Sequence, residues 1–396
     1  MASMPPEKNI SVRSDMSLIA NIFYLAMFGS ELQHRKKGLP GTDRIEKLRR
    51  LFDDANIEAL YVSSPENLYY LSGFTSGDGA LLVSEEQVAL LTDSRYLEQA
   101  KQESPGCVLV EMRDSYPDTL AAYLRNFRIS KLGLDGKHLC YKDYHSFKDR
   151  LSGLNIVETG GLVEKLRLIK DGQEIDKIKT AVGMADQAFA DVLPILKPGL
   201  SEREIALRLE YNMKRLGADD IAFKIIVASG ARSALPHGVA SGKRLETGDL
   251  VTMDFGAVFQ GYHSDITRTM VIDEPDQQQY KIYQIVLEAH LKAMDTVRDG
   301  VVAWEVDKAA RDIITANGYG EYFGHGTGHG LGLYIHEDPR LSQKDQTVLR
   351  KGMTVTIEPG IYLPGWGGVR IEDTVVVEDH GCAVLTGSPK MELISV

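Results

Sequence analysis

The chain has 396 residues, which exceeds the size at which a single hydrophobic core stops growing, so more than one domain is expected. Its composition, 43% hydrophobic and 26% charged, is ordinary for a soluble globular protein, and a net charge of -11 without a basic stripe argues against nucleic-acid binding. Three widely spaced cysteines (Cys107, Cys140 and Cys382) carry no metal-site spacing and indicate a reducing compartment, so a cytoplasmic location is expected.

Residues 1–41 are treated as an extension or leader. The apolar run Leu18–Phe28 is shorter than the roughly 20 residues that a bilayer requires, so no membrane association is expected. Its length suits a signal peptide, but no small-x-small cleavage site follows it. An accessory helix, a leader or an upstream start codon is therefore preferred.

Residues 42–165 are expected to form a first, mixed α/β domain. Thr42–Asn56 is typical of an amphipathic helix with Ile45, Leu48 and Phe52 on one face. Strands are predicted at Ala59–Val62, Ala80–Val83, Val88–Thr92, Cys107–Met112 and Lys131–Leu134, and helices near Ser94–Gln102, Pro117–Phe127 and Tyr141–Leu151. No group of residues here indicates chemistry, and the segment from Glu158 to Leu168 is interpreted as a connection.

Residues 166–396 are expected to form a second, α+β domain built from two similar halves. In the first half, capping boxes at Asp171–Glu174 and Ser201–Glu204 open two helices, and a hairpin follows. In the second half, helices predicted at Gln277–Arg298 and Trp304–Asn317 again precede a hairpin. This order predicts fused, pseudo-symmetric halves with a site between them, and chance similarity is the alternative.

The two hairpins carry carboxylates at matching places. Asp254 lies six residues after Gly248 and is followed by Asp265, while Glu358 lies six residues after Gly352 and is followed by Glu372. A single carboxylate at a strand end usually reaches solvent, but four in duplicated positions favour metal binding. With His329 from the loop between the hairpins, they predict a two-metal hydrolytic site.

The charge and chemical hardness of these donor atoms indicate which metal ions the site would bind. Four carboxylates balance two divalent cations, and oxygen-rich donors with one imidazole favour Mn²⁺, with Co²⁺, Fe²⁺ or Zn²⁺ as alternatives. Of the remaining histidines, His237 and His336 are expected to donate hydrogen bonds to a scissile carbonyl and stabilise its oxyanion.

Six short motifs resemble the pita-bread metallopeptidases, which include aminopeptidase P, prolidase and methionine aminopeptidase. They are Ser229–Gly238, Met253–Ala257, Gly261–Thr269, Gly324–Gly332, Ile357–Gly360 and Val369–Asp373. The resemblance covers the chain from Thr42 to its end and implies a creatinase-like N-terminal domain followed by a pita-bread catalytic domain. A homodimer is expected for the family.

The resemblance also implies roles for individual residues. It makes Asp254, Asp265, His329, Glu358 and Glu372 the ligands of two metal ions, with Asp265 and Glu372 bridging. It further implies that Glu358 is the general base and that His237 and His336 contact the substrate. Arg370 would orient the bridging carboxylates, and His325 would contact the ligands without binding metal itself.

The implied substrate is a peptide with proline at its second position, because minimal methionine aminopeptidases lack the N-terminal domain. The Ser229–Gly238 run resembles compact bacterial aminopeptidases P, so release of the N-terminal residue is the expected activity. Prolidase, which cleaves dipeptides, is the alternative, since Arg340 lies where some prolidases hold the proline carboxylate. Phe223, however, lies where some prolidases have a tyrosine.

Two further interpretations compete with a peptidase. A non-catalytic binding protein and a metal-independent, creatinase-like C–N hydrolase both occur on this fold among members that have lost metal ligands. None of the five ligands is missing here, which argues against both.

Overall fold

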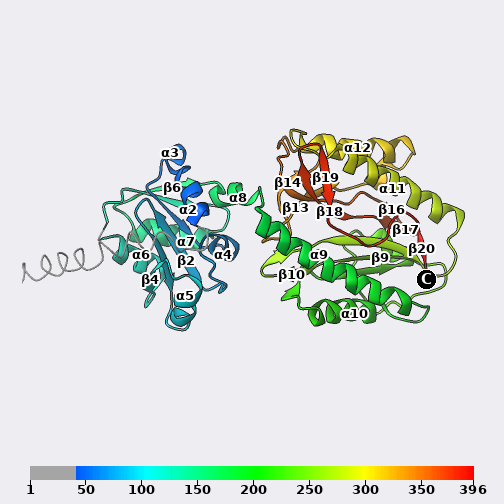
Figure 1. Ribbon diagram of the computed structural model, residues 1–396, viewed down its shortest axis with the longest axis horizontal. Coiled ribbons are helices and arrows are strands. Elements are labelled where there is room, and N and C mark those ends of the chain that lie inside the picture. The colour runs from blue at the N-terminus through cyan, green and yellow to red at the C-terminus, as the bar shows by residue number, and fades with distance from the viewer. Residues whose placement is uncertain (1–41, 126) are drawn as a thin grey trace, which may run out of the picture. The chain divides into compact units, whose positions relative to one another are not determined.

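The computed structural model describes residues 42–125 and 127–396, so the predicted extension over residues 1–41 lies outside the described residues. The chain divides between Leu162 and Val163 into two compact units, which are described separately (Figure 1). None of the helices within the described ranges is both long and apolar enough to cross a membrane.

The first unit is built on one mixed sheet with the strand order β4-β3-β2-β1-β5-β6. Its strands are β1 (Ala59–Val62), β2 (Gly79–Ser84), β3 (Val88–Thr92), β4 (Val108–Glu111), β5 (Lys131–Asp135) and β6 (Asn155–Thr159). Its helices are α2 (Thr42–Arg49), α3 (Phe52–Ala55), α4 (Pro65–Ser72), α5 (Leu97–Glu103), α6 (Tyr116–Leu124) and α7 (Tyr141–Arg150). β1–β2–β3 pair antiparallel and the other neighbours pair parallel, which confirms the predicted mixed α/β domain.

One local prediction for this unit was wrong, and two elements of the first unit were not predicted. The helix predicted over Thr42–Asn56 is two helices, because the amide of Leu51 donates to the carbonyl of Leu48, three residues back, and tightens the turn. Ile45, Leu48 and Phe52 are nevertheless all buried. Helix α4 and strand β6 were not predicted, and the predicted connection over Glu158–Leu168 contains α8 (Leu162–Arg167) and the boundary between the two units.

The second unit repeats one order of elements. Its first half contains α9 (Gly172–Val192), η1 (Leu193–Ile195), α10 (Glu202–Arg215), β7 (Asp220–Ile221), β8 (Ile226–Ser229), η2 (Gly230–Ala234), β9 (Leu250–Phe255), β10 (Ala257–Phe259), β11 (Tyr262–His263) and β12 (Ile266–Val271). Its second half contains α11 (Gln277–Thr296), α12 (Ala303–Ala316), η3 (Gly320–Tyr322), β13 (Gly328–Gly330), β14 (Glu337–Leu341), β15 (Thr354–Ile357), β16 (Gly360–Leu363), β17 (Gly367–Arg370), β18 (Asp373–Glu378), β19 (Gly381–Val384) and β20 (Ile394–Ser395).

The predicted pair of similar halves is confirmed. Both predicted capping boxes, Asp171 with Glu174 and Ser201 with Glu204, open α9 and α10. The helix pair α9 and α10 lies on one side of the strands and the pair α11 and α12 on the other (Figure 1). The two halves also have different main sheets, ordered β20-β12-β9-β8 and β14-β13-β15-β18-β19.

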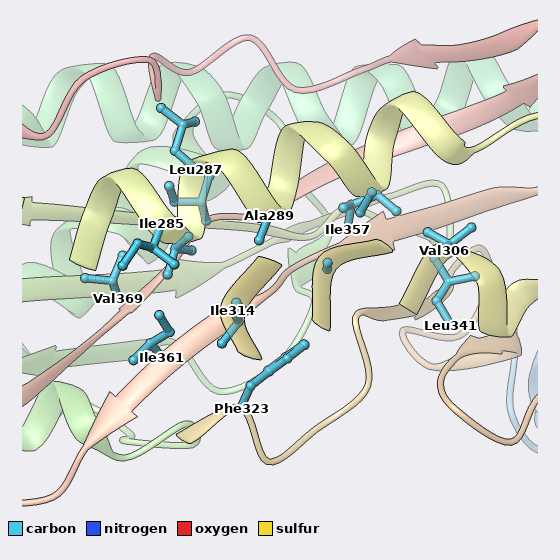
Figure 2. Packing of buried hydrophobic residues seen from close by; sticks show 14 of the residues in the cluster. Ile285, Leu287, Ala289, Val306, Ile314, Phe323, Leu341, Ile357, Ile361 and Val369 are labelled. Atoms are coloured by element: carbon cyan, nitrogen blue, oxygen red, sulfur yellow. The ribbon is translucent and has the colours of Figure 1, made fainter. Parts of the chain in front are cut away.

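Each half has its own hydrophobic core. In the first, residues of α9 and α10 such as Phe189 and Leu209 pack with Phe255 of β9. In the second, Figure 2 shows apolar side chains of two helices meeting those of the strands, among them Ile285, Leu287, Ala289, Val306, Ile314, Ile357, Ile361 and Val369. Two rigid half-cores therefore support the carboxylate-bearing strands from outside.

Candidate metal centre

The two carboxylate hairpins are joined edge to edge. β9 pairs with β12, and β15 pairs with β18. Between the hairpins, the amide of Glu372 donates to the carbonyl of Thr267 at 3.1 Å, and the hydroxyl of Thr374 donates to the carbonyl of Asp265 at 2.9 Å. These contacts join the sheet ordered β20-β12-β9-β8 to the sheet ordered β14-β13-β15-β18-β19, and the carboxylates lie near this join.

Two glycines allow the close backbone approaches beside these residues. A Cβ atom at Gly256 would lie 1.9 Å from the carbonyl oxygen of Ser264, next to Asp265. In the second half, a Cβ atom at Gly328 would lie 1.9 Å from the carbonyl oxygen of Thr356. A larger residue at either place would push apart the segments that bring the candidate ligands together.

Asp265, His329 and Glu372 are buried and offer ligand atoms that all lie within 4.8 Å of one another. His329 Nε2 lies 3.5 Å from Asp265 Oδ2 and 3.4 Å from Glu358 Oε1. Its Nδ1 lies 3.0 Å from the carbonyl oxygen of Gly330, which can only accept, so Nδ1 carries the hydrogen. In the neutral ring Nε2 then directs a lone pair at carboxylate oxygens, an arrangement that suits a cation between them.

The carboxylates have the unsatisfied groups that bound cations would satisfy. Asp254 Oδ1, Asp265 Oδ1 and Glu372 Oε1 are buried and have no hydrogen-bond partner among the described residues. Burial, and then the neighbouring carboxylates, raise the pKa of Asp265 and of Glu372 well above the ordinary value. The residues present therefore fit divalent cations, whose charge would offset this cost.

Arg370 is buried behind the carboxylates. Its Nη2 donates to Asp254 Oδ2 at 2.6 Å, and its Nε donates to the hydroxyl of Thr267 at 3.0 Å. That hydroxyl donates in turn to Glu372 Oε2 at 2.7 Å. Arg370 thus holds Asp254 directly and reaches Glu372 through Thr267, a relay that the strand pattern only partly indicated.

Tyr362 completes this network and was missed in the sequence. Its hydroxyl accepts from Arg370 Nη1 at 2.8 Å and lies 2.9 Å from Nε2 of His325. Burial raises the pKa of Tyr362 to about 12 although Arg370 opposes this, so the phenol stays protonated and can donate to His325. The signal was the position of Tyr362 on a strand that follows Glu358 and pairs with the strand of Arg370.

All nine predicted site residues line one cavity of about 470 Å³: His237, Asp254, Asp265, His325, His329, His336, Glu358, Arg370 and Glu372. The ring of His336 lies 4.5 Å from that of His329, and burial, then His329 and Arg340, lower the pKa of His336 to about 4. His336 is therefore neutral near pH 7. Phe223, Lys224 and Arg340 also line the cavity.

Known proteins resemble this chain along most of its length. Residues 44–169 match the creatinase/prolidase N-terminal domain, and residues 176–379 match metallopeptidase family M24. The Xaa-Pro dipeptidase of Pyrococcus furiosus is 44% identical over 345 residues, covering 87% of this chain and 97% of that protein.

Solved structures agree in fold. An Xaa-Pro dipeptidase from Bacillus anthracis matches with a TM-score of 0.88 and 47% identity, covering 90% of this chain and 100% of that one. An X-Pro aminopeptidase from Thermotoga maritima matches with a TM-score of 0.83 and 38% identity, covering 89% and 99%. With its creatinase-like N-terminal domain and pita-bread catalytic domain, the chain belongs to metallopeptidase family M24.

Proposed function

We propose that the protein is an Xaa-Pro dipeptidase that uses two divalent metal ions held by Asp254, Asp265, His329, Glu358 and Glu372. The observation that carries the proposal is the buried cluster of carboxylates in one cavity, three of which have an oxygen without a partner in the described chain. Mn²⁺ is the proposed metal because the donors are mostly hard oxygen atoms.

The residues of the cavity have different roles in the proposed hydrolysis. Bound divalent ions lower the pKa of water and polarise a scissile carbonyl. Glu358, which is 19% exposed at the cavity, accepts the proton of the attacking water and returns it to the leaving proline nitrogen. His237 and His336 donate hydrogen bonds to the carbonyl oxygen, and Arg370 orients Asp254 through a hydrogen bond.

The dipeptidase activity replaces the aminopeptidase P activity that the sequence favoured. Relatives that carry the name Xaa-Pro dipeptidase support it, including those from P. furiosus and B. anthracis. Arg340 supports it as well, because its exposed guanidinium lines the cavity and makes no ion pair with any described residue. We propose that this guanidinium binds the free carboxylate of a C-terminal proline.

The test compares hydrolysis of Ala-Pro and Ala-Pro-Phe by the Mn²⁺-loaded protein. We expect cleavage of the dipeptide and weak or no cleavage of the tripeptide, because the tripeptide lacks the proline carboxylate. Arg340→Met should raise KM for Ala-Pro by about 10-fold or more, as expected for a lost charge-assisted contact. Arg208→Met, an exposed change on α10, serves as the control.

Efficient cleavage of Ala-Pro-Phe would contradict the dipeptidase proposal and restore the aminopeptidase alternative. Hydrolysis of neither peptide would contradict both and favour a binding protein.

A further inference from the structure

β8 and β14 are edge strands of the two main sheets, and Ile226 of β8 and Arg340 of β14 both line the cavity. In one sheet, Ile226 of β8 pairs with Asp254 of β9. In the other, Arg340 of β14 pairs with His329 of β13. The candidate metal ligands lie between these two edges, so a dipeptide bound across them extends toward one edge from each end.

The β8 edge carries one cation without a partner. Lys224 lies two residues before Ile226, and both line the cavity together with Phe223. The side chain of Lys224 is exposed, and no hydrogen bond or ion pair with a residue of the described ranges engages its ammonium group. Its ammonium group can therefore contact a ligand at the cavity surface.

The two acidic residues that shortly precede Lys224 in the chain contact other groups. Asp220 Oδ1 lies 3.0 Å from the ammonium of Lys214, and Asp219 Oδ2 accepts from the amide of Gln260 at 2.5 Å. The carboxylates inside the cavity form the proposed metal site. No ion pair between Lys224 and a described carboxylate is formed, so its ammonium group can pair with an acidic group of a ligand in the cavity.

We infer that Lys224 is a specificity-determining residue that favours dipeptides with an acidic first residue, Glu-Pro and Asp-Pro. The inference rests on the proposed function: if Arg340 holds the proline carboxylate at the β14 edge, the first residue lies toward the β8 edge. There Phe223 and Ile226 contact the aliphatic part of its side chain, and Lys224 pairs with its carboxylate.

The test measures kcat/KM for two pairs of peptides of nearly equal shape, Glu-Pro against Gln-Pro and Asp-Pro against Asn-Pro. We expect the acidic member to be preferred by about 3- to 10-fold, the range of a partly solvated ion pair. The preference should decrease at high salt, because added ions screen an exposed pair.

Variants of Lys224 separate charge from shape. Lys224→Met should bring the ratio of Glu-Pro to Gln-Pro close to one, and Lys224→Glu should make Lys-Pro better than Glu-Pro. The matched control is Lys197→Met, because Lys197 is exposed and does not line the cavity, so the ratio should stay at its wild-type value.

A ratio near one in the wild-type protein overturns the inference. So does a Lys224→Met protein that loses activity equally on Glu-Pro and Gln-Pro, because Lys224 would then hold a group common to both peptides. If the wild-type protein fails to cleave Ala-Pro, the proposed function itself is wrong and the inference falls with it. Cleavage of Ala-Pro without a preference for acidic residues overturns the inference alone.

Discussion

Glu358 has different surroundings from the other carboxylates of the cavity. Its side chain is 19% exposed, and its Oε1 accepts a hydrogen bond from the hydroxyl of Thr356 at 3.2 Å. Asp265 and Glu372, in contrast, are almost completely buried. A carboxylate that is more accessible than the other candidate ligands is suited to move a proton, which supports the role of general base that the resemblance implies for Glu358.

We predict that Glu358→Gln lowers kcat for Ala-Pro by about 10³-fold, since glutamine keeps an oxygen donor but cannot accept the proton. Steady-state kinetics with metal content measured on the same sample would check this. Glu288→Gln, which changes an exposed residue of α11, is the control and should be fully active. Unchanged activity in Glu358→Gln would disprove the assignment.

For single residues, the sequence predicted the candidate carboxylate ligands, which occupy matching places in the two hairpins. It did not predict all of the residues that link these ligands by hydrogen bonds. The nine candidates lie together because each hairpin has its own recognisable carboxylates and the loop between the hairpins has a distinctive histidine. Tyr362 and the relay through Thr267 could not be found in this way. The contacts of Tyr362 with His325 and of Thr267 with Glu372 depend on which distant segments become neighbours, and residue spacing within one hairpin does not encode that.

Among elements, the start of β14 is tied to the segment that begins the second unit. Glu337 accepts from the guanidinium of Arg167 in α8 and lies 3.0 Å from the ammonium of Lys170. All three side chains are at most 9% exposed. Burial alone would raise the pKa of Glu337, but Lys170 and Arg167 outweigh it and lower the pKa from 4.5 to about 2.

We predict that Glu337→Gln lowers the free energy of unfolding by about 3 kcal/mol at pH 7. Because the folded-state pKa is depressed, this stabilisation is complete above the unfolded pKa of 4.5 and is lost as the pH falls through about 2. The difference between the proteins should therefore shrink to about half by pH 3. Urea unfolding at both pH values would measure it.

The exposed change Glu321→Gln is the control for this experiment and should cost little at either pH. A cost for Glu337→Gln that is equally large at pH 7 and pH 3 would mean that shape rather than charge stabilises this contact.

Helices with strong local sequence signals were predicted well, but the pairing of strands that are distant in the sequence was not. The capping boxes of α9 and α10 formed because each is a contact between residues three apart. Helix α4 also had local signals, a Ser64 cap, Pro65 in its first turn and Gly73 after its end, which were overlooked. The pairing of β14 with β13, in contrast, depends on the intact sheet.

For the whole molecule, the duplication of helix pair and hairpin was readable from the order of elements. The way in which the halves join could not be predicted, because it depends on contacts between the two hairpins, in segments about a hundred residues apart, such as Thr267 with Glu372. That join has an energetic consequence. Asp254 and Asp265 come from one half, while His329, Glu358 and Glu372 come from the other, so metal ions held by all five would link the two half-cores.

We predict that removing divalent metal with a chelator lowers the Tm of the second unit by about 5–10 °C and that Mn²⁺ restores it. A ligand at 100 times its Kd stabilises the folded state by about 2.7 kcal/mol, and a unit of this size shifts by about 2–4 °C for each kcal/mol. Differential scanning calorimetry of metal-free and Mn²⁺-loaded protein measures the shift. His329→Ala is the comparison, because its Tm should respond much less to Mn²⁺. A Tm that is the same with and without metal would contradict a metal link between the halves, and retained hydrolysis in chelator would favour the metal-independent alternative.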